Sequence, residues 1–152
     1  MSKVFIIAEA GANHNRDFDQ AKALIDVAVK AKADAVKFQT FKAEEQVTAE
    51  APKANYQLKF NSEYKTQKEM LKNLEMSNEM HREIINRCKI KKIEFLSTAF
   101  DPASLKYLLE LGIKRIKIPS GEITNFFLLE EAASSNLDII ISTGMCNITD
   151  IE

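Results

Sequence analysis

The sequence predicts an α/β fold built on a parallel sheet, for two reasons. Five short runs rich in Ile, Val and Phe have the length of strands, and they cover residues 4–11, 34–41, 94–100, 115–121 and 137–144. Segments in which apolar residues recur at helical spacing separate these runs. Strands that alternate with helices form right-handed βαβ units, so we expect all five strands to lie parallel in one sheet.

The expected helices have recognisable ends. Acidic Asp17 and Asp19 open the segment 17–32, where the helix dipole favours negative charge. Gly112 ends the helix after the third strand, because glycine readily adopts the left-handed conformation found just beyond a helix. Side chains that can accept a backbone N–H are expected to cap the later helices. These caps are Ser77, Asp101, Asn125, and Asn147 or Thr149.

The spacing of the strands is uneven. The second and third strands start 60 residues apart, whereas the other neighbouring strands start 21 to 30 residues apart. The excess length is a polar insertion between residues 42 and 77, with a helical stretch near 65–75. An insertion this long is more often functional than a mere connection, so we expect it to contribute to a site.

Five parallel strands suit either a complete flavodoxin-like sheet, in a binding or signalling domain, or the first five units of a (β/α)8 barrel of about 250 residues. Lys37 and Lys117 interrupt apolar strands and favour the barrel. Helices cover both faces of a flavodoxin-like sheet, so a mid-strand lysine there would be buried without a partner, at a cost of several kcal/mol. A barrel strand turns one face to the lumen, which opens at its carboxyl-terminal end into the active site. Strand order 1-2-3-4-5 would support the barrel, and 2-1-3-4-5 the alternative.

Polar side chains occur at the carboxyl-terminal ends of all five predicted strands. They include Glu9, Lys37, Gln39, Thr98, Lys117, Ser120 and Ser142. The two lysines and the three hydroxyls suit a phosphate or a carboxylate, and the glutamine suits a neutral polar group. The role of Glu9 stays open at this point. It could act as an acid or base, accept a hydrogen bond from a polyol, or simply pair with a neighbouring lysine.

Composition and charge argue against several classes of protein. A net charge of −1 leaves no basic excess for a nucleic acid, and no apolar run approaches the roughly 18 residues of a membrane span. The amino-terminal segment has no signal peptide, so we expect a cytoplasmic protein with two reduced thiols. His14 is expected in a loop and His81 on the surface of a helix, and neither has the spacing of a metal site.

Six separated motifs resemble the N-acetylneuraminate (sialic acid) synthase family, in its sialate and legionaminate branches. In chain order they are "IIAEAGANHN", "AVKFQTFKAEE", "APKANYQLK", "FLSTAFD", "KIPSGEITN" and "ISTGM". The match covers essentially all 152 residues in the correct order. The resemblance implies that residues 1–152 are the N-terminal part of a (β/α)8 barrel domain, with later strands and an antifreeze-like domain absent from this chain.

The resemblance also implies a reaction. Members of the family condense phosphoenolpyruvate with an N-acetylated amino sugar, either N-acetylmannosamine or a 2,4-diacetamido relative, and yield a nonulosonic acid and phosphate. This chemistry belongs to carbohydrate biosynthesis, including precursors of lipopolysaccharide and capsule. A divalent metal ion, Mn²⁺ or Mg²⁺, polarises the sugar aldehyde, and its histidine ligands lie on later strands that this chain lacks. Family members form homodimers.

The motifs carry roles for individual residues. The resemblance gives Glu9 a contact with the sugar and a part in proton transfer. Lys37 and Lys117 are implied to bind phosphoenolpyruvate, and Gln39 and Asn61 to bind the sugar. The hydroxyls implied to complete the phosphoenolpyruvate site are Thr98, Ser120 and Ser142.

Three positions depart from the family pattern. Arg16 stands where the family has a glycine, Ala99 stands where it has a proline, and "NFFLL" stands where it has "NFPLL" or "NYPLL". If the turn at Arg16 needs a positive φ, this change strains the backbone. We expect a chain of five barrel units to be inactive alone and to aggregate through its open sheet edges.

Overall fold

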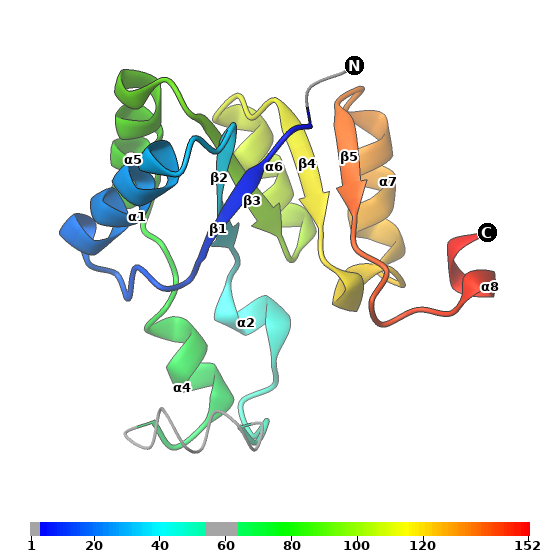
Figure 1. Cartoon of the computed structure of the whole chain (residues 1–152). Coiled ribbons are helices and arrows are strands. Elements are labelled where there is room, and N and C mark those ends of the chain that lie inside the picture. Colours follow the sequence, from blue (N-terminus) through cyan, green and yellow to red (C-terminus); the bar gives the residue numbers. More distant parts are fainter. Residues whose placement is uncertain (1–3, 54–63) are drawn as a thin grey trace.

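The computed structural model describes residues 4–53 and 64–152 (Figure 1). Its strands are β1 (Ile7–Gly11), β2 (Ala35–Thr40), β3 (Glu94–Ala99), β4 (Arg115–Ile118) and β5 (Asp138–Ile141). They form one sheet, pair in parallel and follow the order β1-β2-β3-β4-β5. Sequential order confirms the barrel-type arrangement and rules out the flavodoxin-like order for this sheet.

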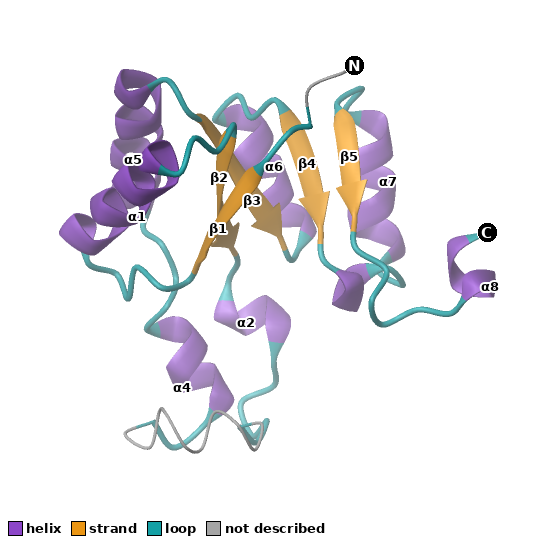
Figure 2. Ribbon diagram, in the orientation of Figure 1, coloured by secondary structure: helices purple, strands orange, loops and turns teal. Residues whose placement is uncertain are grey.

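Four helices lie on one side of the sheet (Figure 2). They are α1 (Phe18–Lys30), α5 (Asn78–Lys91), α6 (Pro102–Glu110) and α7 (Phe126–Ser134). Their N-caps are Asp17, Ser77, Asp101 and Asn125, and each accepts the backbone N–H three residues further on. Asn147 caps the short α8 (Ile148–Ile151) in the same way. Local side chains therefore set where each helix begins, as the sequence predicts.

In its described residues, 42–53 and 64–77, the insertion between β2 and α5 contains two short helices, α2 (Ala43–Gln46) and α4 (Gln67–Lys72). Both stand at the carboxyl-terminal edge of the strands, below the arrowheads in Figure 1. The predicted helical stretch near 65–75 is confirmed as α4, which Thr66 and Glu69 begin with a capping box. After β4, the chain makes a single 3₁₀ turn, η1 (Ser120–Glu122).

The side-chain alternation of the strands separates core from lumen. Val36 and Phe38 of β2 are buried in the cluster that β1 and β2 form with α1 and α5. Lys37 and Gln39 alternate with them, so they face the opposite side of the sheet. In β4, the buried isoleucines on either side of Lys117 pack against α6 and α7. The polar residues thus occupy the face that the four helices leave free.

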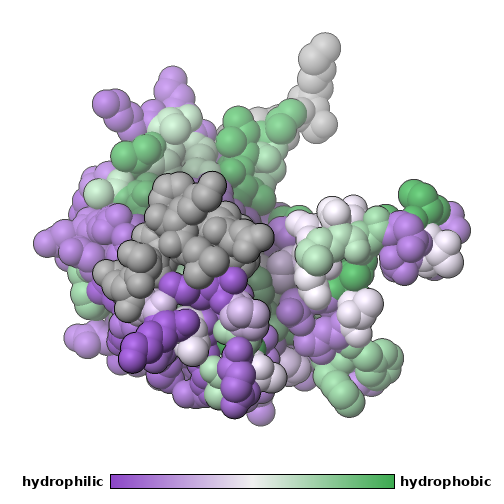
Figure 3. Space-filling model, turned by 90° about the horizontal axis from the view of Figure 1, so that it is seen from below, coloured by the Kyte–Doolittle hydropathy of each residue, from purple (hydrophilic) through white to green (hydrophobic). Residues whose placement is uncertain are grey.

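The outer strands of the described sheet each have one unpaired edge. Among residues 4–53 and 64–152, β1 pairs only with β2, and β5 only with β4. Large apolar side chains are exposed on these outer parts, namely Val4, Phe5, Ile6, Phe126, Phe127, Ile139, Ile141, Met145, Ile148 and Ile151. Seen onto the carboxyl-terminal edge, hydrophobic residues gather beside the N-terminal segment and toward α8 (Figure 3). Within the described residues, none of the helices is long and apolar enough to cross a membrane.

The turn from β1 to α1 does require positive φ. Asn15 has φ of 46° and Arg16 has φ of 59°, which is left-handed backbone. Asparagine tolerates this conformation better than arginine, whose Cβ crowds the neighbouring carbonyl oxygen. The strain expected from the Arg16 departure is therefore present.

We expect Arg16→Gly to raise the free energy of unfolding by about 1 kcal/mol, because glycine removes that crowding. Urea denaturation measures the change. The matched variant Arg16→Ala keeps a Cβ and should bring no such gain. An equal gain from alanine would show that backbone strain is not the cause.

The prediction that His81 lies on the surface is wrong. Its side chain is buried against the sheet, where Nδ1 lies 3.0 Å from the Ser77 carbonyl oxygen and Nε2 lies 2.9 Å from Thr40 Oγ1. Thr40 Oγ1 in turn lies 2.8 Å from Ser97 Oγ. The ring belongs to the same helical stripe as Met80 and other buried residues of α5. A histidine can lie on this buried stripe because both of its ring nitrogens have hydrogen-bond partners there.

Candidate active site

Strand register brings the predicted site residues together at the carboxyl-terminal end of the sheet. Glu9 is opposite Lys37 in the β1–β2 ladder, and Gln39 is opposite Thr98 in the β2–β3 ladder. Thr98 is in turn opposite Lys117 in the β3–β4 ladder. Residues directly opposite in parallel strands point to the same face, so these five side chains share the lumen.

Lys37 links the first three strands. Its Nζ forms an ion pair with Glu9 Oε2 and donates a 3.3 Å hydrogen bond to Thr98 Oγ1. The lysine side chain is largely buried, whereas the Glu9 side chain is half exposed. Of the alternatives left open for Glu9, pairing with a lysine is therefore the one present in this structure. The pairing leaves the Glu9 side chain half exposed, so its carboxylate is still accessible from the lumen.

Lys117 links the fourth and fifth strands. Its Nζ donates to Ser142 Oγ at 2.5 Å and to the Ile118 carbonyl oxygen at 2.6 Å. Burial lowers the pKa of Lys117, the positive charge of Lys37 lowers it further, and Glu9 opposes the effect. The Lys37 and Lys117 ammonium groups are thus close enough for the charge of Lys37 to disfavour the charged form of Lys117. An anion placed between them would relieve this repulsion.

The loops after β4 and β5 also meet at this edge. A Cβ added at Gly144 would lie 3.9 Å from Ser120 Oγ, so the turn that carries Ser120 lies next to the loop that follows Ser142. On the other side of the site, Gly11 has φ of 57°, and a Cβ there would lie 3.3 Å from Glu9 Oε1 and 3.7 Å from Gln39 Nε2. A side chain at residue 11 would crowd Glu9 and Gln39, which converge over this glycine.

A cavity of about 330 Å³ opens beside these residues, under the helices of the insertion. It is lined by Ala12, Gln39, Phe41, Gln46, Val47, Gln67, Leu71, Leu74, Phe100 and Glu122. Among the described residues, no lysine or arginine lines it, and apart from Glu122 the lining consists of apolar side chains and amides. A neutral, partly apolar group therefore fits this cavity better than an anion.

Sequence reasoning missed Glu122 as a site residue. Its carboxylate lines the cavity and accepts a 2.8 Å hydrogen bond from Asn125 Nδ2. The signal was present, since Glu122 follows β4 by four residues in the same "PSGE" turn that contributes Ser120. Phe41 and Phe100 were missed as well, and they form part of the apolar wall. Asn61, a predicted sugar contact, lies outside the described residues.

The described residues do not fit a divalent metal centre. Across residues 4–53 and 64–152, no group of three or more His, Cys, Asp or Glu side chains is placed to hold an ion. His14 and His81 are both buried. The His14 ring lies against Phe38 of the core cluster and His81 belongs to α5, so both are on the helical side of the sheet, away from the lumen. Burial also raises the pKa of the Cys88 thiol to about 12, so this cysteine is neither a nucleophile nor a ready metal ligand.

The chain is similar to known synthases of acidic sugars. It is 52% identical over 147 residues to the N,N'-diacetyllegionaminic acid synthase of Legionella pneumophila, and 49% identical over 152 residues to that of Campylobacter jejuni. These matches cover 97% and 100% of this chain. Among solved structures, the N-acetylneuraminic acid (sialic acid) synthetase of Leptospira borgpetersenii, in complex with citrate, superposes with a TM-score of 0.84 at 37% identity over 99% of the chain.

The chain is shorter than the proteins it matches. It spans 41% and 46% of the two legionaminic acid synthases and 48% of the sialic acid synthetase structure. The NeuB family model matches residues 24–152, which include β2 to β5 and therefore both lysines of the site. On the strength of this match, the chain belongs to the NeuB family.

Proposed function

We propose that this chain is the N-terminal part of the barrel domain of a synthase that condenses phosphoenolpyruvate with an N-acetylated amino sugar. The convergence of Lys37 and Lys117 on one face of the strand ends is the observation that carries the proposal. Phosphoenolpyruvate bears a phosphate and a carboxylate, and two fixed cations with adjacent hydroxyls suit both groups. The names of the similar proteins support the same reaction class.

In this proposal, the residues of the site bind and orient phosphoenolpyruvate. Lys37 and Lys117 neutralise its charge, and the hydroxyls of Thr98, Ser120 and Ser142 donate to its oxygens. A bond forms between C3 of the enol and the sugar aldehyde carbon, water adds at C2, and phosphate leaves as the C2–O bond breaks. The positive charges also stabilise the departing phosphate, so they lower the activation barrier as well as strengthen binding.

Two proton transfers balance this reaction. The aldehyde oxygen gains a proton as it becomes a hydroxyl, and the attacking water loses one. A carboxylate or carboxylic acid can serve either step. Glu9 is the candidate for the sugar side because it converges with Gln39 next to the cavity, and Glu122 is the second carboxylate within reach of that cavity.

We propose that the cavity under α2 and α4 receives the sugar. A 2,4-diacetamido sugar carries two acetyl groups, so it is more apolar than N-acetylmannosamine, which carries one. The aromatic and leucine side chains of the cavity suit the first sugar better. The two legionaminic acid synthases with 52% and 49% identity favour it as well.

The remaining components belong to the whole protein in this proposal. A divalent cation and a homodimer are expected from the family resemblance, and no donor set for the cation exists among the described residues. No step above depends on either. The cytoplasm remains the proposed location, because phosphoenolpyruvate is a cytoplasmic metabolite.

The test uses the protein that carries this chain, supplied with Mn²⁺ and phosphoenolpyruvate. We expect phosphate to appear only when an acceptor sugar is also present, and faster with the 2,4-diacetamido sugar than with N-acetylmannosamine. Phosphate release is measured with a coupled colorimetric assay, and the new sugar acid by mass spectrometry. Release without any sugar, or a product that retains phosphate, would contradict the proposed reaction.

A further inference from the structure

We propose that Glu75 is a positioning residue that holds α2 in place as a wall of the sugar cavity. Glu75 lies between α4 and α5 and is 8% exposed. Its Oε1 accepts a 2.7 Å hydrogen bond from the backbone N–H of Ala43, the first residue of α2. A carboxylate 32 residues further along the chain thus serves as the cap of this helix.

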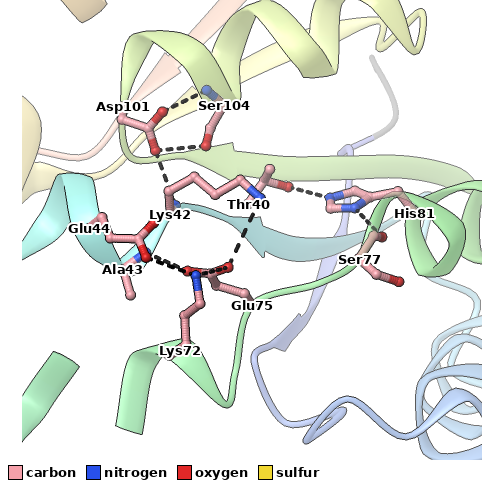
Figure 4. Close-up of polar contacts among 10 residues, drawn as sticks. All are labelled: Thr40, Lys42, Ala43, Glu44, Lys72, Glu75, Ser77, His81, Asp101 and Ser104. Atoms are coloured by element: carbon pink, nitrogen blue, oxygen red, sulfur yellow. Dashed lines mark hydrogen bonds and ion pairs between the residues drawn. The ribbon is translucent and has the colours of Figure 1, made fainter. Parts of the chain in front are cut away.

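The helix has no cap of its own. Lys42 occupies the N-cap position and its side chain makes no capping hydrogen bond. The backbone N–H of Lys42 instead donates to Asp101 Oδ2 at 3.4 Å, from the start of α6 (Figure 4). Two remote carboxylates therefore receive consecutive N–H groups where β2 ends. A helix of four residues cannot hold itself in place, so its position depends on these contacts.

Glu75 also joins α2 to α4. Its Oε2 lies 3.6 Å from Lys72 Nζ and 4.0 Å from Lys42 Nζ. Lys72, at the end of α4, donates a 3.0 Å hydrogen bond to Glu44 of α2. Figure 4 shows these side chains converging around Glu75. The carboxylate is therefore the buried centre of a charged cluster, whereas Glu44 lies on its exposed rim.

The elements that Glu75 joins are the ones that line the cavity. Gln46 and Val47 come from α2 and its end, and Gln67 and Leu71 come from α4. The partners of the Glu75 carboxylate, namely Lys42, Ala43 and Lys72, do not line the cavity, so the carboxylate would act through the helices rather than on a ligand. We call the contacts of the Glu75 carboxylate with α2 and α4 the clamp. Loss of the clamp is therefore expected to weaken binding of the sugar while leaving Lys37 and Lys117 in place.

This inference rests on the proposed function, and kinetics in the whole protein test it. In Glu75→Ala, we expect the KM for the sugar to rise about tenfold or more, because a buried hydrogen bond to a charged group is lost. The kcat and the KM for phosphoenolpyruvate should stay within about twofold, as expected when only ground-state binding of one substrate is removed. Glu75→Gln keeps an oxygen acceptor for the Ala43 N–H, and should restore most of the sugar affinity.

The matched control is Glu44→Gln. Glu44 pairs with the same lysine but makes no bond to the start of α2, so its loss should leave all constants unchanged. Equal rises of both KM values in Glu75→Ala, or an effect of Glu44→Gln as large as that of Glu75→Ala, would overturn the positioning role.

A second measurement does not require activity. Hydrogen exchange, followed by mass spectrometry, should show protection of the Ala43 amide in wild type and Glu75→Gln, and its loss in Glu75→Ala. Unchanged protection in Glu75→Ala would refute the clamp. If the clamp is present but the wild type converts no sugar, the proposed function fails independently. If Glu75→Ala does not fold, fast exchange at Ala43 in the wild type would still refute the clamp.

Discussion

Replacing Lys117 by alanine in the whole protein is expected to lower kcat/KM for phosphoenolpyruvate by about a hundredfold or more, the scale set by loss of a preorganised charge that stabilises a transition state. Lys117 is half buried and donates a hydrogen bond to Ser142, and no other described cation replaces it at the end of β4. Phosphate release at varied phosphoenolpyruvate and saturating sugar measures the loss.

Lys114 provides the control for charge alone. It lies three residues earlier in the sequence, is exposed, and lines a groove at the opposite end of the strands. Lys114→Ala removes the same net charge and should leave kcat/KM unchanged. Unchanged activity in Lys117→Ala, with the variant folded, would remove Lys117 from the site.

Acidification is expected to destabilise the fold through His14. Burial, together with the smaller effect of the nearby His81, lowers the pKa of His14 from 6.5 to about 4. Between these two pKa values, the unfolded chain binds a proton at His14 that the folded chain excludes. The contribution of His14 to the free energy of unfolding is therefore fully present above pH 6.5 and is lost as the pH falls toward 4. Between pH 7 and pH 5, this histidine alone is expected to remove about 2 kcal/mol from the free energy of unfolding.

The geometry around His14 supports this reading. Its Nδ1 accepts the backbone N–H of Arg16 at 3.0 Å, which places the neutral ring's proton on Nε2. Among the described residues, Nε2 is buried and has no hydrogen-bond partner, so a positive ring would lack any compensation there. Burial also lowers the pKa of His81, which adds an effect in the same direction.

Urea denaturation at pH 7 and pH 5 checks this expectation, with His14→Gln as the comparison. The glutamine keeps a hydrogen-bond acceptor but cannot titrate, so the difference between the two pH values should shrink by about 2 kcal/mol. An identical pH dependence in wild type and variant would show that His14 is not the group responsible.

Much of the fold was predictable because it rests on local signals. The caps at Asp17, Ser77, Asp101 and Asn125 lie where the sequence places them, since each is a short-range hydrogen bond. The lumen face of β2 follows from side-chain alternation alone. The predicted end of the fourth strand was less accurate. The prediction extends it to residue 121, but β4 ends at Ile118 because Pro119 turns the chain into η1.

The candidate site was predictable only in part. Lys37 and Lys117 stood out because a charge in an apolar strand needs a reason, and the sheet places them on one face. Glu122 does not stand out in this way, because a carboxylate in a polar turn is ordinary and only its position after β4 points to the site. Glu75 could not be found at all, since its partner, the Ala43 N–H, belongs to the backbone of a helix that is 32 residues away in the chain.

A structure of the whole protein with phosphoenolpyruvate bound tests the central claim most directly. The two lysines of β2 and β4 are predicted to contact the ligand, with Nζ of Lys37 and of Lys117 within hydrogen-bond distance of its phosphate or carboxylate oxygens. Glu9 and Gln39 should face the side of the ligand where the sugar enters. Phosphoenolpyruvate bound elsewhere, with the Glu9–Lys37 pair and the Lys117–Ser142 bond undisturbed, would contradict the assignment of this face as the active site.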